Sequence, residues 1–292
     1  MNDNSVCGIV ERNKLTYRGV MMLVKTSTKQ NNTQNVRYIQ GFVNFNKVKL
    51  SVYCYEIDGV LIDTGSASLL TSFKPFFEKA DIDQVAITHY HEDHTGGAGY
   101  LQHTYNIPIY MNENSIESCQ EKAHYPFYRK MFWGKRAPFT AKPIGHTFTS
   151  REASWSVIPT PGHATDHLAF LNNETGQLFS GDLYVHPKTK VILREESIPQ
   201  IIQSIKHILT FDFNEMFCCH AGYVQNGREA FRHKLSYLEE VRGNVLTLRQ
   251  TGYSIKDIQQ TLFPKKYPIT LFSFGEWHSK HIVTSILESE KG

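Results

Sequence analysis

Residues 88–97 read THYHEDHTGG and directly follow an apolar run, QVAIT, which predicts a short buried strand. Three histidines and an aspartate in an HxHxDH pattern would pack poorly in a core. Neutral imidazole and carboxylate groups are, however, ligands that zinc accepts. Gly96 and Gly97 allow close backbone packing where the next helix begins. The stretch therefore predicts a metal-binding loop, with an isolated surface site or a chance His-rich turn as the alternatives.

Three further potential ligands each follow an apolar run. They are His163 in PTPGHATDH, Asp182 in LFSGDLY and His220 in MFCCHAG. Taken singly, a histidine of this kind can be a satisfied core residue, and an aspartate can accept backbone N–H groups in a turn. Because strands of one sheet bring their ends to one edge, the three together are expected to converge on the same site.

The remaining pattern predicts an α/β protein. Residues 15–60 read as strands LTYRGVMMLV, VRYIQGFVNF and LSVYCYEI, with a polar loop TSTKQNNTQN after the first. GVLID (59–63) is a buried strand and SLLTSFKPFFEKA a helix. A helix near residues 97–105 precedes the strand-like runs IPIYMN, WSVIPT, HLAFLN, QLFSGD and EMFCCH. Residues 115–143 are harder to place, and helices are expected near 228–250, 255–262 and 277–287.

Composition argues for a cytoplasmic protein. Lys and Arg total 31 against 28 Asp and Glu, and a net charge of +3 predicts neither a nucleic-acid nor a membrane partner. The five cysteines (Cys7, Cys54, Cys119, Cys218 and Cys219) form no CxxC pair, which suits a reducing compartment. The amino end, MNDNSVCGIVERNKL, has no apolar run of signal-peptide length. The oligomeric state is left open.

The motifs LIDTG, THYHEDHTGG, PGHATDH, SGD and CHAG together resemble the metallo-β-lactamase superfamily over about residues 45–225. The helical tail is similar to that of its glyoxalase II-like and lactonase-like members. The resemblance implies a four-layer αβ/βα sandwich with a C-terminal helical extension. It divides the chain into a catalytic domain, residues 1–226, and the extension, residues 227–292.

The resemblance also implies the ligands of two divalent metal ions, zinc first, with iron or manganese as alternatives. It assigns His89, His91 and His163 to one ion and Asp93, His94 and His220 to the other, with Asp182 bridging both. Asp63, in LIDTG, and His167 are candidates to orient ligand side chains, although Asp63 could equally cap its own turn.

Such a site predicts a hydrolase in which a metal-bridging hydroxide cleaves a small-molecule substrate, namely an ester, a thioester or a lactone. Asp93 and Asp182 are then the catalytic residues besides their ligand roles. The alternatives are a mononuclear iron enzyme of the persulfide dioxygenase kind and a nuclease acting on phosphodiesters. A serine route is disfavoured because the chain has no GxSxG motif, and Cys218 and Cys219 are expected to be buried structural thiols.

Substrate contacts are less defined. The segment 119–142 mixes aromatic residues with Lys122, Arg129, Lys130, Lys135 and Arg136. It fits either a helix packing its aromatics on the sandwich or a binding insertion beside the metals. Tyr184 and Tyr223 each lie within three residues of a predicted ligand and are candidates to meet the substrate.

Overall fold

The computed structural model describes residues 6–7, 11–17 and 20–290, with side chains from Val24 to Glu290. The chain forms two compact units. Unit 1 comprises Met1–Val157 and Phe170–Thr175, and unit 2 comprises Ile158–Ala169 and Gly176–Gly292.

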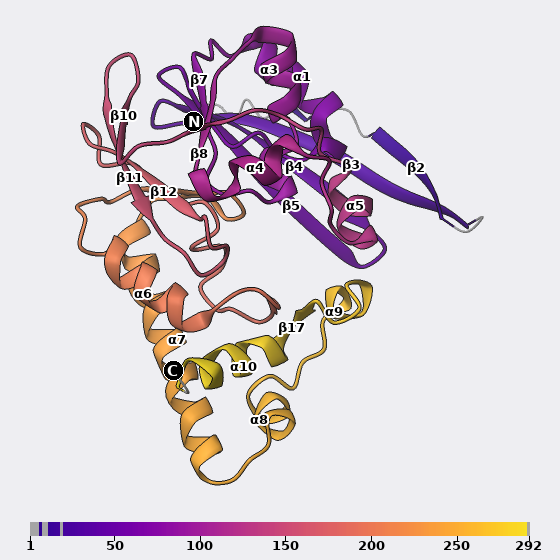
Figure 1. Ribbon diagram of the computed structural model, residues 1–292, viewed down its shortest axis with the longest axis vertical. Helices are drawn as coiled ribbons and strands as arrows, with labels where there is room; N and C mark the ends of the chain where they lie inside the picture. The colour runs from indigo at the N-terminus through magenta and orange to yellow at the C-terminus, as the bar shows by residue number, and fades with distance from the viewer. Residues whose placement is uncertain (1–5, 8–10, 18–19, 291–292) are drawn as a thin grey trace. The chain divides into compact units, whose positions relative to one another are not determined.

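Unit 1 is built on a large mixed sheet, which has nine strands within the described residues. The order is β1-β3-β4-β5-β6-β7-β8-β9, with β2 also pairing with β3. Pairing is antiparallel from β3 to β6 and parallel from β6 to β9. The bounds are β1 Val6–Cys7, β2 Glu11–Tyr17, β3 Val20–Thr33, β4 Val36–Phe45, β5 Val48–Ile57, β6 Val60–Ile62, β7 Gln84–Ala86, β8 Ile109–Met111 and β9 Lys142–Pro143. Figure 1 shows the long early strands in indigo and violet.

Short helices of unit 1 bury aromatic faces against this sheet. Helix α1 (Leu70–Lys79) buries Phe73, Phe76 and Phe77, and it contacts β3 and β4. Helix α5 (Phe127–Trp133) also contacts β4 and buries Tyr128, Met131, Phe132 and Trp133. The others are η1 Ala67–Leu69, α2 Glu92–Thr95, α3 Ala98–Tyr105, η2 Glu113–Ser115 and α4 Ile116–Gln120.

Strands of a second sheet follow in the chain. They are β10 (Thr147–Thr149), β11 (Ser154–Pro159) and β12 (Leu168–Asn172). β10 and β11 pair antiparallel, and Phe148 stacks on Trp155 with ring centroids 5.4 Å apart.

Unit 2 combines short strands with the helical tail. β13 (Leu178–Phe179) pairs parallel with β15 (Met216–Cys218), and the ring of Phe179 stacks on that of Phe217. β15 pairs antiparallel with the next strand, β16 (Gly222–Val224). Helices α6 (Ile198–Ile208), α8 (Ile255–Leu262) and α10 (Ser279–Ser289) all contact the long helix α7 (Gly227–Gln250), as the orange and yellow ribbons of Figure 1 show. A two-stranded sheet joins β14 (Ile192–Leu193) to β17 (Trp277–His278), with α9 (Pro268–Phe272) before it.

The structure corrects two predicted elements. The predicted loop over residues 26–35 is wrong for residues 26–33, which continue β3 and pair with β4, with Thr26 and Thr28 buried despite their polarity. The connection to β4 is only the turn at Gln34 and Asn35. The predicted helix over 277–287 begins later, because Trp277 and His278 are extended and the His278 side chain caps α10 by accepting the N–H of Lys280.

Other predictions concern parts that the structure does not test. The predicted strand over 15–24 includes residues 18–19, and the amino end includes residues 1–5 and 8–10, which lie outside the described residues. The boundary between residues 226 and 227 stays a prediction. None of the helices in the described ranges is long and apolar enough to cross a membrane.

Candidate metal centre

The HxHxDH residues of unit 1 lie on a short connection that leaves β7 and enters α2. Side chains of His89, His91, Asp93 and His94 are all buried. The ring nitrogens His89 Nε2 and His91 Nδ1 lie 3.0 Å apart, and His94 Nε2 lies 3.8 Å from Asp93 Oδ1. We call these four residues the unit 1 donor cluster.

Gly96, which follows α2, packs closely against the backbone of the turn after β6. A Cβ atom on Gly96 would lie 2.2 Å from the backbone nitrogen of Ala67, so no larger residue fits without displacing the backbone. The N–H of Gly96 also donates to the carbonyl of Gly65 (2.7 Å). The short helix carrying Asp93 and His94 is therefore held directly against the turn that follows β6.

Asp63 anchors the unit 1 donor cluster from the end of β6. Its carboxylate accepts the backbone N–H and the hydroxyl of Thr88, both at 2.8 Å, and lies 2.8 Å from His94 Nδ1. A carboxylate on one ring nitrogen fixes the tautomer and orientation of the imidazole, with Nε2 as the opposite ring nitrogen. Burial, together with the charge of Asp63, raises the pKa of the neighbouring Cys54 thiol well above its ordinary value.

A buried ion pair holds the other face of α2. Arg129 of α5 donates from Nε and Nη2 to the two carboxylate oxygens of Glu92, at 2.6 and 2.7 Å. Burial raises the pKa of Glu92, and the guanidinium opposes that shift. Arg136 is also buried, and it donates to the backbone carbonyls of Cys119 and Ser118. In segment 119–142, these two arginines hold neighbouring parts of the chain together. Tyr128, Phe132, Trp133 and Phe139 are buried, whereas Phe127 is 39% exposed, and a substrate-binding role of the segment stays a prediction.

In unit 2, three potential ligands meet around one carboxylate oxygen. Asp182 Oδ2 lies 3.3 Å from His163 Nε2 and 2.9 Å from His220 Nε2. His163 and Asp182 are buried and His220 is half-buried. We call these three residues the unit 2 donor cluster.

The loops of the unit 2 donor cluster are fixed by neighbouring side chains. His167 accepts the N–H of Asp182 at Nε2 (2.9 Å), and its Nδ1 lies 2.8 Å from Thr160 Oγ1. The Cys218 thiol donates to the carbonyl of Gly181 (3.4 Å), and burial raises its pKa. Cys218 and Cys219 are both buried, as predicted.

Glu196, absent from the predicted site, is placed against a predicted ligand. Its Oε2 lies 3.1 Å from His163 Nδ1, and its Oε1 accepts the N–H of Leu193 at 2.7 Å. Glu196 is buried and stands just before α6. The sequence carries no signal for this contact, because the two residues are distant along the chain and LREESIPQ has no recognisable spacing.

The two tyrosines predicted to meet substrate have partners within unit 2. Tyr184 is buried with its ring against Phe231, and its backbone carbonyl accepts a hydrogen bond from the Lys234 ammonium (2.5 Å). Burial lowers the pKa of Lys234 to about 8. Tyr223 donates its hydroxyl to Glu215 (2.8 Å). Substrate contact by either tyrosine stays a prediction.

The chemistry of both clusters suits a divalent metal. Buried imidazole and carboxylate groups are costly unless they are hydrogen-bonded, paired or bound to a cation. Two nitrogen ligands of one tetrahedral zinc lie roughly 3.3 Å apart, close to the 3.0 Å between His89 Nε2 and His91 Nδ1. Residues able to hold a metal ion occur in both units, Asp63, His89, His91, Asp93 and His94 in unit 1 and His163, Asp182, Cys219 and His220 in unit 2.

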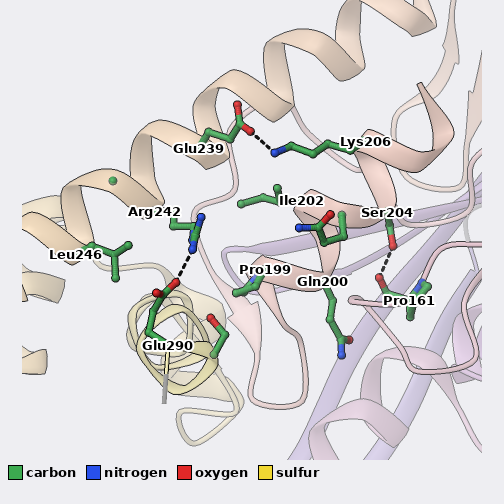
Figure 2. A pocket seen from close by; sticks show the side chains of 13 residues that line it. Pro161, Pro199, Gln200, Ile202, Ser204, Lys206, Glu239, Arg242, Leu246 and Glu290 are labelled. Carbon is green, nitrogen blue, oxygen red and sulfur yellow. Dashed lines mark hydrogen bonds and ion pairs between the residues drawn. The ribbon is translucent and has the colours of Figure 1, made fainter. Parts of the chain in front are cut away.

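A hollow of about 580 Å³ in unit 2 is not part of these clusters. Figure 2 shows it between α6, α7 and the end of α10, where Lys206 pairs with Glu239 (2.7 Å) and Arg242 with Glu290. Its charged side chains neutralise one another, so the hollow presents no unbalanced charge to a ligand.

Comparison with known proteins identifies the class. The family model of the metallo-beta-lactamase superfamily matches residues 49–252, and the chain belongs to that superfamily. The matched region contains all seven residues of the two donor clusters.

Curated relatives share parts of the chain. It is 30% identical over 156 residues to the beta-lactamase-like protein 2 homolog of Drosophila melanogaster, covering 51% of this chain and 48% of the relative. It is 34% identical over 131 residues to thioesterase pkgB of Emericella nidulans, covering 42% and 32%. It is 28% identical over 127 residues to a hydroxyacylglutathione hydrolase of Bdellovibrio bacteriovorus, covering 42% and 43%. The match thus spans half or less of each of these relatives.

Solved structures match over more of the chain. A beta-lactamase domain protein from Burkholderia ambifaria gives a TM-score of 0.65 at 16% identity, covering 90% of this chain and 88% of that one. A metallo-beta-lactamase family protein from Thermus thermophilus gives 0.60 at 17% identity, covering 83% and 89%. The predicted fold class, an α/β protein of the metallo-β-lactamase fold, is confirmed.

Proposed function

We propose that this protein is a metal-dependent hydrolase that cleaves an ester, a thioester or a lactone. The observation that carries the proposal is the pair of donor clusters, buried except for half-buried His220 and each made of the imidazole and carboxylate groups that zinc prefers. Relatives named as a thioesterase and as a hydroxyacylglutathione hydrolase support a hydrolytic reaction at an acyl carbon.

In this proposal the seven ligands hold two divalent ions, with zinc as the expected metal. His89, His91 and His163 would bind one ion, Asp93, His94 and His220 the other, and Asp182 both. Bound there, two divalent cations would polarise the acyl oxygen and lower the pKa of a bound water toward neutrality.

The protein's own residues would contribute orientation and proton transfer. Asp63 and Glu196 each hold one ring nitrogen of a predicted ligand, His94 and His163, and so direct Nε2 of each ring. Asp93 would accept a proton as water attacks the acyl carbon. The chain's own nucleophiles are not needed, and Cys218 is engaged with the carbonyl of Gly181.

The first test is metal content and turnover of Asp182→Asn against Asp212→Asn, an exposed aspartate used as the matched control. The parent protein and the control should contain about two zinc ions per chain and hydrolyse a short acyl thioester. The D182N variant should lose at least one ion and most turnover, because it removes the carboxylate shared by both ions.

Three results would redirect the proposal. Full metal and full activity in D182N would reject the bridging assignment. One iron and no zinc per chain, with oxygen uptake on a persulfide, would favour the dioxygenase alternative. Cleavage of phosphodiesters without cleavage of acyl substrates would favour a nuclease.

A further inference from the structure

A second cavity, of about 730 Å³, opens within the helical tail of unit 2. It is bounded by α8, α9 and the end of β17, elements drawn in yellow in Figure 1. Much of its lining is apolar, from Val191, Phe263, Pro264, Tyr267, Leu271 and Phe274. Its volume falls in the range of roughly 300–1,000 Å³ typical of small-molecule sites.

Two large apolar side chains of this cavity are turned toward solvent. Leu271 is 82% exposed and Phe274 is 89% exposed, while the other exposed large hydrophobic residues reach at most 44% among the described side chains. Water contact with such surfaces is unfavourable, so a ligand that covers them gains binding free energy.

The backbone holds Phe274 in this position. Its φ is +52°, the left-handed region that bulky residues rarely adopt. The turn is closed by hydrogen bonds from the N–H of Gly275 to Thr270 (2.9 Å) and from the N–H of Trp277 to the Ser273 hydroxyl (2.9 Å). A bulky residue kept in a costly conformation, with its ring in water, indicates a surface shaped for binding.

The charged side chains of the cavity lining are all positive. Lys265 and Lys266 lie side by side and are exposed, and His278 is half-buried. The described residues that line the cavity include neither aspartate nor glutamate. Neither lysine forms an ion pair within the part of the chain that the structure describes. This differs from the hollow in Figure 2, where each cation has its own carboxylate.

Lys265 Nζ lies over the ring of Tyr267, 5.6 Å from its centroid, and no carboxylate of the described residues pairs with either lysine. An apolar chamber with two such cations at its rim fits an amphipathic anion. We propose that this cavity binds a medium-chain acyl anion, with the hydrocarbon chain against Leu271 and Phe274 and the carboxylate at Lys265 and Lys266. The site is independent of the proposed hydrolysis, because binding requires neither a metal ion nor turnover.

Residues of the cavity lining are also connected to a predicted metal ligand within unit 2, through the small sheet and Glu196. Two residues of the lining lie at the small sheet of β14 and β17. Val191 comes directly before β14, and His278 belongs to β17 and pairs with Ile192. The next residue, Leu193, donates to Glu196, whose other carboxylate oxygen contacts His163. A ligand in the cavity thus lies against the same strands that position Glu196.

The experiment is calorimetric titration of the whole 292-residue chain with decanoate below its micelle concentration. We expect saturable 1:1 binding. The double variant Lys265→Gln/Lys266→Gln should weaken it roughly tenfold, from the loss of two exposed charge interactions. The matched control Arg249→Gln/Lys256→Gln removes two exposed cations outside the lining and should leave affinity unchanged. The variant Leu271→Ser/Phe274→Ser, at positions that contribute little to the core, should also weaken binding.

Several outcomes would overturn the proposal. They are absence of saturable binding, equal affinity in the parent and the K265Q/K266Q variant, and equally tight binding of uncharged 1-decanol. Binding only to vesicles of anionic phospholipid, without binding of monomeric decanoate, would also overturn it and would identify a membrane surface as the occupant.

Discussion

Replacing Arg129 by methionine should destabilise unit 1 strongly, although the residue is on no predicted ligand list. The Glu92 carboxylate is 3% exposed and accepts two short hydrogen bonds from a guanidinium that is 12% exposed. Removing one partner of a buried pair leaves an uncompensated charge and costs about 3–5 kcal/mol. At about 2 °C per kcal/mol for a chain of this size, the melting temperature should fall by roughly 6–10 °C.

The assay is thermal unfolding of Arg129→Met, Glu92→Gln and the double variant, followed by circular dichroism. The double variant should be more stable than the sum of the two single losses predicts, because it buries no lone charge. Lys135→Met is the matched control, since this lysine is exposed in the same segment. The reasoning is refuted if R129M and K135M shift the melting temperature equally.

Two other predictions concern the surroundings of the donor clusters. Asp63→Asn should lower metal affinity about 10–100-fold, because it weakens the hold on His94 Nδ1; chelator competition measures this, and an unchanged affinity contradicts it. Between pH 8 and 9 the free energy of unfolding should rise by about 1 kcal/mol. Folded Lys234 releases its proton in this range because its pKa is lowered to about 8, whereas the same lysine in the unfolded chain keeps its proton. Denaturant titrations should show this slope vanish in Lys234→Met, and its persistence there would assign it to another group.

The sequence was most informative where the predicted ligands lie close together along the chain. In THYHEDHTGG the ligand spacing, the preceding strand and the glycines occur within a few residues, so local pattern sufficed to place a buried cluster after β7. Local pattern failed over residues 26–33. There the polarity suggests a loop, while pairing with β4 and the burial of Thr26 and Thr28 make a strand.

Contacts between distant residues had no such signal. Glu92 occupies one of the two unspecified positions of the HxHxDH motif, and Arg129 lies in a segment whose pattern is hard to place, so their pairing becomes visible only in three dimensions. The same is true of Glu196 and His163. Lys234 has the helical spacing of an ordinary surface residue, yet it is buried with its ammonium on a carbonyl of another segment.

The route of the chain through the two units limits how it can be made. Unit 1 needs Phe170–Thr175, and unit 2 needs Ile158–Ala169, so the chain passes from one unit to the other after residues 157, 169 and 175. During synthesis on the ribosome, unit 1 therefore cannot be completed until residue 175 has emerged. A cut after residue 157 removes Phe170–Thr175 from unit 1, and a cut after residue 175 removes Ile158–Ala169 from unit 2, so no single cleavage point leaves both units with all their residues. A fragment ending at residue 157 would keep β11 but lose β12, its neighbour in the second sheet.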